Sequence, residues 1–318
     1  NNAWTNNDIT NYYLTVPRQN VETGFWLESD RMLSLDFSER SLEVQRGVVM
    51  EEFKQRCLNQ PYGDVGHLLR PLAYRAHTYQ WPTIGKDLSH IANATLEEVK
   101  AFFFRFYAPN NAVLAVTGNI SFEEAVELTE KWFGSVPRRE VPVRNLPQEP
   151  EQTEERRLTV ERNVPLDSLF MAYHMCDHRH PDYYVFDILS DVLSNGRSSR
   201  LNQHLVQEKQ LFSSIDAYIS GSVDAGLFHI AGKPSAGVSL ELAEAAVRDE
   251  LDRLQQELVD GQELEKVKNK FESTQIFGNI NYLNVATNLA WFELLGKAED
   301  LEKEVERYRS VTAMQLRE

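Results

Sequence analysis

A chain of 318 residues, of which 42% are hydrophobic and 25% charged, has room for two domains with substantial cores. Its net charge of −15 argues against nucleic acid as a partner, because the phosphates would be repelled. No segment approaches the roughly 20 apolar residues of a membrane-spanning helix, so we expect no membrane span. Two cysteines, Cys57 and Cys176, are too few for a disulfide framework or a cysteine-rich zinc module, and they do not distinguish cytoplasm from periplasm.

The first 135 residues show strand and helix patterns in alternation. Pro17 ends a run of β-formers, and Pro61 with Gly63 ends a long helical pattern. Thr95 followed by Glu98 is a capping-box pattern, which marks the start of a helix. The elements predicted for this part are a strand over residues 10–16, a helix over 38–58, a helix over 95–106, a strand over 111–117 and a helix beginning at 121.

Residues 136–155 contain four prolines and few apolar side chains, a composition typical of a linker. This linker separates a first domain, residues 1–135, from a second domain, residues 156–318. The elements predicted for the second domain are strands over 157–161, 168–174, 212–220 and 226–232, helices over 181–193 and 198–209, and long helices from 239 onward. Because both halves mix strands and helices in a similar way, we predict an α+β fold of two similar domains, each a mainly antiparallel sheet with helices packed on one face.

One predicted helix carries a carboxylate beside its apolar stripe, which consists of Leu42, Val49 and Phe53. Glu52 lies on the shoulder of this stripe, whereas Glu51 points away from it. A carboxylate near a core is costly unless it is paired or bound to a metal, so an ion pair with arginine, exposure to water and a metal ligand all stay open. Gln45, seven residues before Glu52 on the same face, is either a hydrogen-bond partner for such a site or a surface amide.

A series of short motifs runs through the whole chain. Those of the first half are Asn2-Ala3-Trp4-Thr5 with Asp8, Thr10 and Tyr12-Tyr13, then Val48-Val49-Met50-Glu51-Glu52, His77 with Tyr79, and Phe106-Tyr107-Ala108-Pro109-Asn110-Asn111. Those of the second half are His180-Pro181-Asp182-Tyr183-Tyr184 and Gly196-Arg197-Ser198-Ser199-Arg200-Leu201. In this order they resemble the motifs of the pitrilysin-type, or inverzincin, M16 metallopeptidases, a family that includes the mitochondrial processing peptidase.

The resemblance implies a zinc-dependent peptidase. That family binds zinc through an H-x-x-E-H motif, whose glutamate is the general base, and through a glutamate on a later helix. The resemblance assigns this third ligand to Glu52, with Glu51 and Gln45 in supporting positions, and it assigns Asn2 and Ala3 to a strand whose edge binds an extended peptide. No H-x-x-E-H occurs in the chain. We therefore expect the other two Zn2+ ligands and the general base upstream of residue 1, and an inactive fragment truncated at both ends.

Two departures from the family pattern imply a partner. The family often carries a supporting glutamate where this chain has Gln45. It also offers an arginine and a tyrosine to the substrate, and an ungapped match finds Val206 and Ser213 at those positions. The resemblance thus implies an endopeptidase or oligopeptidase with a clam-shell chamber, in which a homologous subunit supplies the Arg/Tyr pair. The alternatives are a non-catalytic structural subunit and a peptide-binding module of the same fold.

Two other patterns in the second half admit a site. Four alternating residues would share one face of a strand and could bind a metal, namely His174, Cys176, His178 and His180. The proline and aspartate that follow favour a loop instead. Residues 196–200 could bind phosphate or carry a nucleophilic serine, but Ser198 as the N-cap of a helix explains them more simply.

Overall fold

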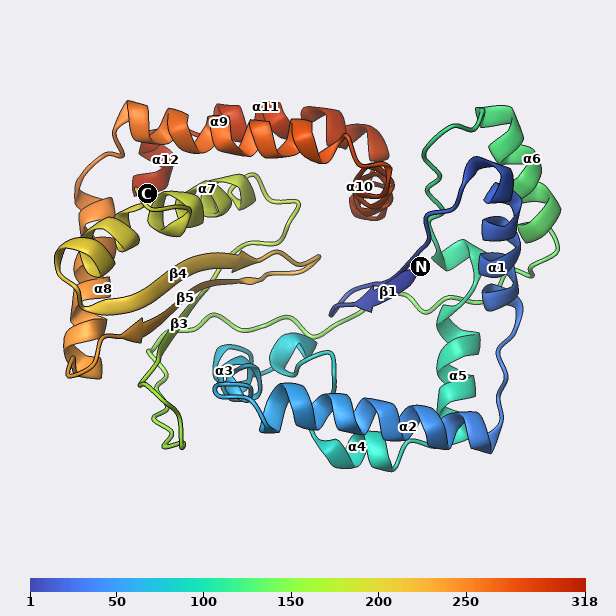
Figure 1. The fold of residues 1–318 in the computed structure, drawn as a ribbon, viewed down its shortest axis with the longest axis horizontal. Coiled ribbons are helices and arrows are strands. Elements are labelled where there is room, and N and C mark those ends of the chain that lie inside the picture. Colours follow the sequence, from blue (N-terminus) through green and yellow to red (C-terminus); the bar gives the residue numbers. More distant parts are fainter. The chain divides into compact units, whose positions relative to one another are not determined.

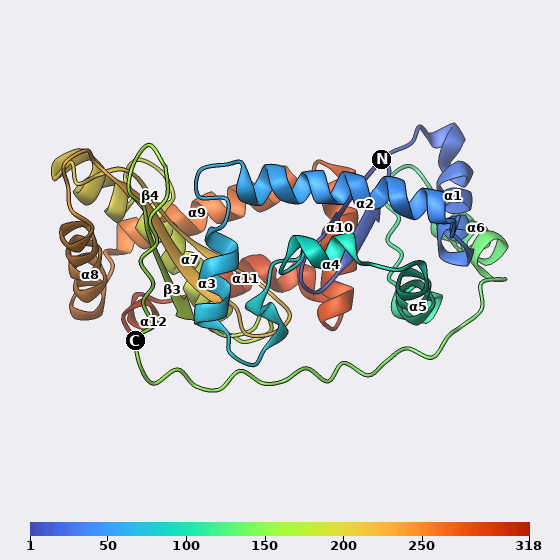
Figure 2. The same cartoon turned by 90° about the horizontal axis from the view of Figure 1, so that it is seen from below.

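The computed structural model describes residues 1–318, which divide into two compact units. Figures 1 and 2 show the elements of both. The first unit comprises Asn1–Glu155 with Asn281–Ala298, and the second comprises Arg156–Ile280 with Glu299–Glu318. Residues 281–298, which the sequence analysis assigned to the second domain, are thus grouped with the first unit. The similarity of two domains joined by a linker over residues 136–155 stays a prediction.

The first unit is mainly helical and contains one hairpin. Its strands are β1 (Asn2–Thr5) and β2 (Thr10–Tyr13), and its helices are α1 (Val21–Leu33), α2 (Glu39–Phe53), α3 (Val65–Ala73), α4 (Leu88–Ala92), α5 (Leu96–Phe106), α6 (Phe122–Phe133) and α10 (Tyr282–Leu295). A π-helical turn, Lys54–Leu58, continues α2. The capping box predicted for Thr95 and Glu98 is present, and Ser38 caps α2, because both side chains satisfy amides that the first helical turn leaves unpaired.

The second unit has a three-stranded antiparallel sheet in the order β3–β5–β4. Its strands are β3 (Leu169–His174), β4 (Phe212–Ser220) and β5 (Leu227–Pro234), and its helices are α7 (Tyr183–Ser194), α8 (Leu240–Gln256), α9 (Gly261–Gly278), α11 (Glu304–Ser310) and α12 (Ala313–Arg317). Helix α7 packs on the sheet at β4, and Ile188, Ile215 and Ile230 belong to one buried core. The predicted α+β class with antiparallel sheets is confirmed.

Three of the predicted elements are wrong in type or extent. Residues 111–117 and 157–161, predicted as strands, pair with no other strand. Their patterns favour extended backbone, but a strand also needs a neighbour to complete its hydrogen bonds, and no other segment of the chain supplies one. The helix predicted over 198–209 begins only at Arg200 and is π-helical over Asn202–Glu208.

Candidate functional site

The hairpin of β1 and β2 presents a free strand edge. Ala3 pairs with Tyr12 in an antiparallel register, and the sheet contains no third strand. All four residues of β1 are exposed, and the Asn2 side chain accepts a hydrogen bond from the Ala3 amide at 2.8 Å. Such an edge leaves backbone N–H and C=O groups directed outward, which is the arrangement to which an extended peptide adds as a new strand.

The hairpin is anchored to the rest of the first unit through β2, and its turn is held by internal hydrogen bonds. The hydroxyls of Tyr12 and Tyr107 lie 2.5 Å apart, and burial raises the pKa of Tyr107, so that its hydroxyl stays protonated. In the turn, Asn6 accepts hydrogen bonds from the amides of Asp8 and Ile9, both at 2.9 Å. The free edge therefore belongs to an anchored strand pair.

Helix α2 carries the two neighbouring glutamates Glu51 and Glu52 near its C-terminal end. The apolar stripe is as predicted, since Phe53 is buried and its ring meets the His67 ring edge-on at 5.2 Å between centroids. Beside it, Glu52 Oε1 lies 2.9 Å from Arg56 Nη2, and the Glu52 side chain is 41% exposed. Glu51 lies 3.6 Å from Lys54, and Gln45 is exposed. The ion pair with arginine and exposure to water are both present, and the metal-ligand alternative stays a prediction.

This ion pair leaves Glu52 available for other ligands. A half-exposed pair four residues apart on a helix contributes only about 0.5 kcal/mol or less, because water screens it. A carboxylate oxygen is a suitable zinc donor. However, no group of three or more His, Cys, Asp or Glu side chains in this chain lies together so as to hold a metal ion. The residues present therefore supply one donor of the right chemistry but no complete metal site.

The histidines that follow β3 do not form a metal cluster. His178 is buried against Tyr183, with ring centroids 4.0 Å apart, and burial lowers its pKa to about 4. Burial likewise raises the pKa of the Cys176 thiol to about 11. The His180 ring accepts a hydrogen bond from the Asp182 amide at 3.2 Å. The loop interpretation is therefore the right one for this segment.

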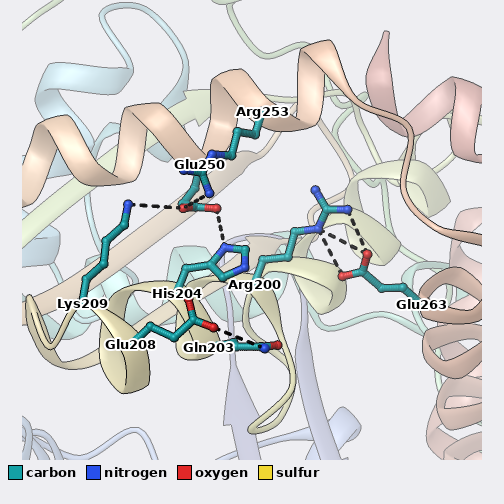
Figure 3. A network of polar contacts seen from close by, with 8 residues as sticks. All are labelled: Arg200, Gln203, His204, Glu208, Lys209, Glu250, Arg253 and Glu263. Atoms are coloured by element: carbon teal, nitrogen blue, oxygen red, sulfur yellow. Dashed lines mark hydrogen bonds and ion pairs between the residues drawn. The ribbon is translucent and has the colours of Figure 1, made fainter.

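The segment 196–200 belongs to a polar network rather than to a phosphate or nucleophile site. Ser198 as an N-cap is wrong, because its hydroxyl accepts a hydrogen bond from Lys266 at 3.1 Å instead. Arg200 binds the carboxylate of Glu263 with two nitrogens, its shortest contact being 2.9 Å, and Figure 3 shows this pair beside a second one. The charge of Arg200 is thus matched by Glu263 of α9.

The second group of contacts in Figure 3 is formed around Glu250 of α8, whose side chain is 1% exposed. Its carboxylate lies 2.8 Å from His204 Nδ1, 3.1 Å from Arg253 and 3.8 Å from Lys209. The sequence analysis missed this residue. Its signal is the position of Glu250 on the apolar face of α8, in step with Ala243, Val247 and Leu254.

The two positions matched to the missing Arg/Tyr pair have ordinary roles. Val206 packs against the hydrophobic core of the second unit. The Ser213 hydroxyl donates to the Lys233 carbonyl at 3.0 Å, at a register shift in β4. Neither side chain carries a charge or a phenol to a substrate.

Known proteins resemble this chain along most of its length. A family model called Peptidase M16 inactive domain matches residues 93–271, which leaves Asn2, Ala3, Gln45, Glu51 and Glu52 outside the matched range. The zinc protease PqqE of Helicobacter pylori is 30% identical over 270 residues, which are 84% of this chain and 61% of that protein. The probable mitochondrial-processing peptidase subunit beta of Schizosaccharomyces pombe is 25% identical over 242 residues, or 72% of this chain and 52% of that protein.

Solved structures share the fold as well. A crystal structure of a protease from Helicobacter pylori superposes with a TM-score of 0.92 at 27% identity, covering 99% of this chain and 77% of that one. The chain spans less than two thirds of the length of the curated relatives named above. No helix of the structure combines the length and the apolar character needed to cross a membrane.

Proposed function

This chain belongs to the M16 peptidase family, and several of its relatives are named zinc proteases. We therefore propose that it forms part of a zinc-dependent endopeptidase or oligopeptidase. In this proposal the edge of β1, at Asn2 and Ala3, binds an extended peptide. Glu52 supplies one carboxylate oxygen to Zn2+, and the remaining ligands and the general base come from outside these 318 residues.

The observation that carries the proposal is the exposed, unpaired edge of β1 on an anchored hairpin. Backbone hydrogen bonds along such an edge bind peptides of many sequences, which suits a peptidase. The weak pairing of Glu52 is consistent with a second role for its carboxylate, since Arg56 is exposed and can turn away.

The residues of this chain bind and orient, while the metal supplies the reactivity. Zinc held by three protein ligands acidifies a bound water toward neutral pH. Here Glu52 would contribute negative charge and one donor atom, and Gln45 on the same helix face could hydrogen-bond that carboxylate. Glu51, paired with Lys54, would add negative charge beside the site. The β1 edge would hold the peptide extended.

We further propose that a homologous subunit completes the enzyme as the other half of a clam-shell chamber. This rests on Val206 and Ser213, which occupy the positions where an Arg/Tyr pair is expected. The subunit would supply that pair to the substrate. Full peptidase activity of the intact protein without any partner would exclude this arrangement.

A second candidate is a non-catalytic subunit that holds peptides or supports an active partner. The name of the matching family model, an inactive domain, favours it. Such a subunit would bind an extended peptide at β1 without cleaving it.

Substituting Glu52→Gln in the intact protein distinguishes the two candidates. Glutamine keeps the size but removes the anionic donor, so the first candidate predicts loss of both bound zinc and peptide cleavage. Glu43→Gln is the matched control, because Glu43 lies on the same helix and makes the same kind of ion pair, with Arg46. Bound zinc is measured by elemental analysis, and cleavage is followed with a quenched fluorescent peptide. Unchanged zinc content in Glu52→Gln would contradict the assigned ligand.

A further inference from the structure

The first half of the proline-rich segment is held against the first unit. Arg139 donates to the Tyr107 carbonyl at 2.8 Å, and its amide donates to Asn110 at 3.1 Å. Its guanidinium also lies 4.8 Å from the centre of the Phe104 ring. The proline-rich segment, although it has the composition of a linker, is thus held in place at Arg139.

A second fixed point is Glu149, near the far end of this segment. Its carboxylate accepts hydrogen bonds from three successive amides, of Arg75, Ala76 and His77, at 2.7, 2.8 and 2.9 Å. Three charge-assisted bonds from backbone amides hold a carboxylate firmly. We call residues 139–149 the strap.

Between these points the strap reaches the turn of the β1–β2 hairpin. Arg144 Nη2 lies 2.8 Å from Asp8 Oδ1, and the Asp8 side chain is only 2% exposed. The hydroxyl of Tyr79, which is itself buried, donates to the same oxygen at 2.7 Å. Tyr79 lies two residues after the loop that Glu149 holds, so the strap bears on two partners of the Asp8 carboxylate, Arg144 and Tyr79.

We propose that Arg144 and Glu149 are positioning residues that hold the β1 edge in the geometry that accepts a peptide. A two-stranded hairpin is marginally stable alone, so its edge is well ordered only if the turn is anchored. The anchor is a buried carboxylate, which requires a compensating charge, and Arg144 supplies it from outside the hairpin. This inference rests on the proposed function of β1, but the strap itself is independent of it.

The expected kinetic effect is confined to binding. Loosening the edge lowers the fraction of molecules that accept a peptide, so KM rises while kcat stays near its original value. The metal content stays unchanged, because the contacts that hold the strap are made to the hairpin turn, to residues 75–77 and to residues 104–110. A purely structural role would instead lower the amount of folded enzyme without changing KM.

The test compares Arg144→Ala with Arg138→Ala in the intact protein. Arg138 is the matched control, since it lies in the same proline-rich segment, carries the same charge and is exposed. Hydrogen exchange of the amides in residues 2–13 is measured by mass spectrometry, with α5 as an internal reference. We expect exchange in the hairpin to accelerate about 10-fold in Arg144→Ala, with KM for an extended fluorescent peptide raised about 5-fold, and neither effect in Arg138→Ala.

Further results decide the proposal. Arg144→Lys keeps the positive charge, so its hairpin exchange rate and its KM should lie close to those of the unsubstituted protein. This variant replaces Arg144→Ala in the test if Arg144→Ala does not fold. Unchanged hairpin exchange in Arg144→Ala would overturn the strap, and accelerated exchange with unchanged KM would overturn its role in positioning. If the unsubstituted protein neither binds nor cleaves the peptide, the proposed function fails, whereas the exchange measurement still reports on the strap.

Discussion

Glu304→Gln should make the second unit more stable at alkaline pH. Glu304 lies at the start of α11, where the Gln275 side chain of α9 donates a hydrogen bond to it. Burial, and after it the charge of Asp187 on α7, raise the pKa of the Glu304 carboxyl to about 7. Asp187 is itself half-buried and accepts a hydrogen bond from Tyr308 at 2.5 Å. Two carboxyl groups therefore share one poorly solvated site.

The sign and size of the effect follow from the two pKa values of Glu304. The folded protein holds the proton more tightly than the unfolded chain, since its pKa is about 7 rather than 4.5. The stability that the protonated Glu304 carboxyl contributes to the folded state is complete below pH 4.5, falls as the pH rises, and is lost above about pH 7. A difference of about 2.5 pKa units, at about 1.36 kcal/mol each, corresponds to about 3 kcal/mol. Glutamine stays neutral, so this dependence disappears in the variant.

The free energy of unfolding of Glu304→Gln is compared with that of the unsubstituted protein at about pH 5 and about pH 8, by urea unfolding followed by far-UV circular dichroism. All five tryptophans lie in the first unit, so tryptophan fluorescence follows that unit separately and should not change. Glu306→Gln, an exposed position on the same helix, is the control. Asp187 keeps part of the pH dependence in both proteins. Equal stability differences at the two pH values would refute the reasoning.

Two substitutions in the second unit give the remaining predictions. Glu250→Ala removes the carboxylate shared by His204, Lys209 and Arg253 together with the packing of a side chain that is 1% exposed, and should lower the free energy of unfolding by about 3 kcal/mol. The exposed Asp249→Ala should change it by about 0.5 kcal/mol or less. An equal effect of both in urea unfolding would mean that the network contributes nothing. Gly232→Ala would bring a Cβ within 2.6 Å of the buried Phe212 ring, so we expect a loss of about 1–3 kcal/mol. Gly261→Ala, whose Cβ meets nothing within 4 Å, should melt like the original protein, and matching melting curves for both glycine variants would show that the core tolerates the added carbon.

The helix starts of this protein can be predicted from its sequence, because the interactions that form them join residues close together in the chain. The Thr95–Glu98 capping box and the Ser38 cap join residues three apart, so the pattern of polar residues before an apolar run is sufficient to find them. The position of Glu52 beside Phe53 on α2 follows from helical periodicity alone. Its role as a zinc ligand, by contrast, was implied by family resemblance and stays a prediction.

Pairing over long distances was decided only by the tertiary structure. Residues 111–117 have the side chains of a strand, but no partner segment pairs with them, and strand propensity carries no information on partners. The contact of Arg144 with Asp8 joins residues 136 positions apart, and the three amides that bind Glu149 lie more than 70 positions away. Before folding, Arg144 is one exposed arginine among several in a proline-rich stretch. It becomes an anchor only because the folded chain buries a carboxylate that needs a positive charge at that point.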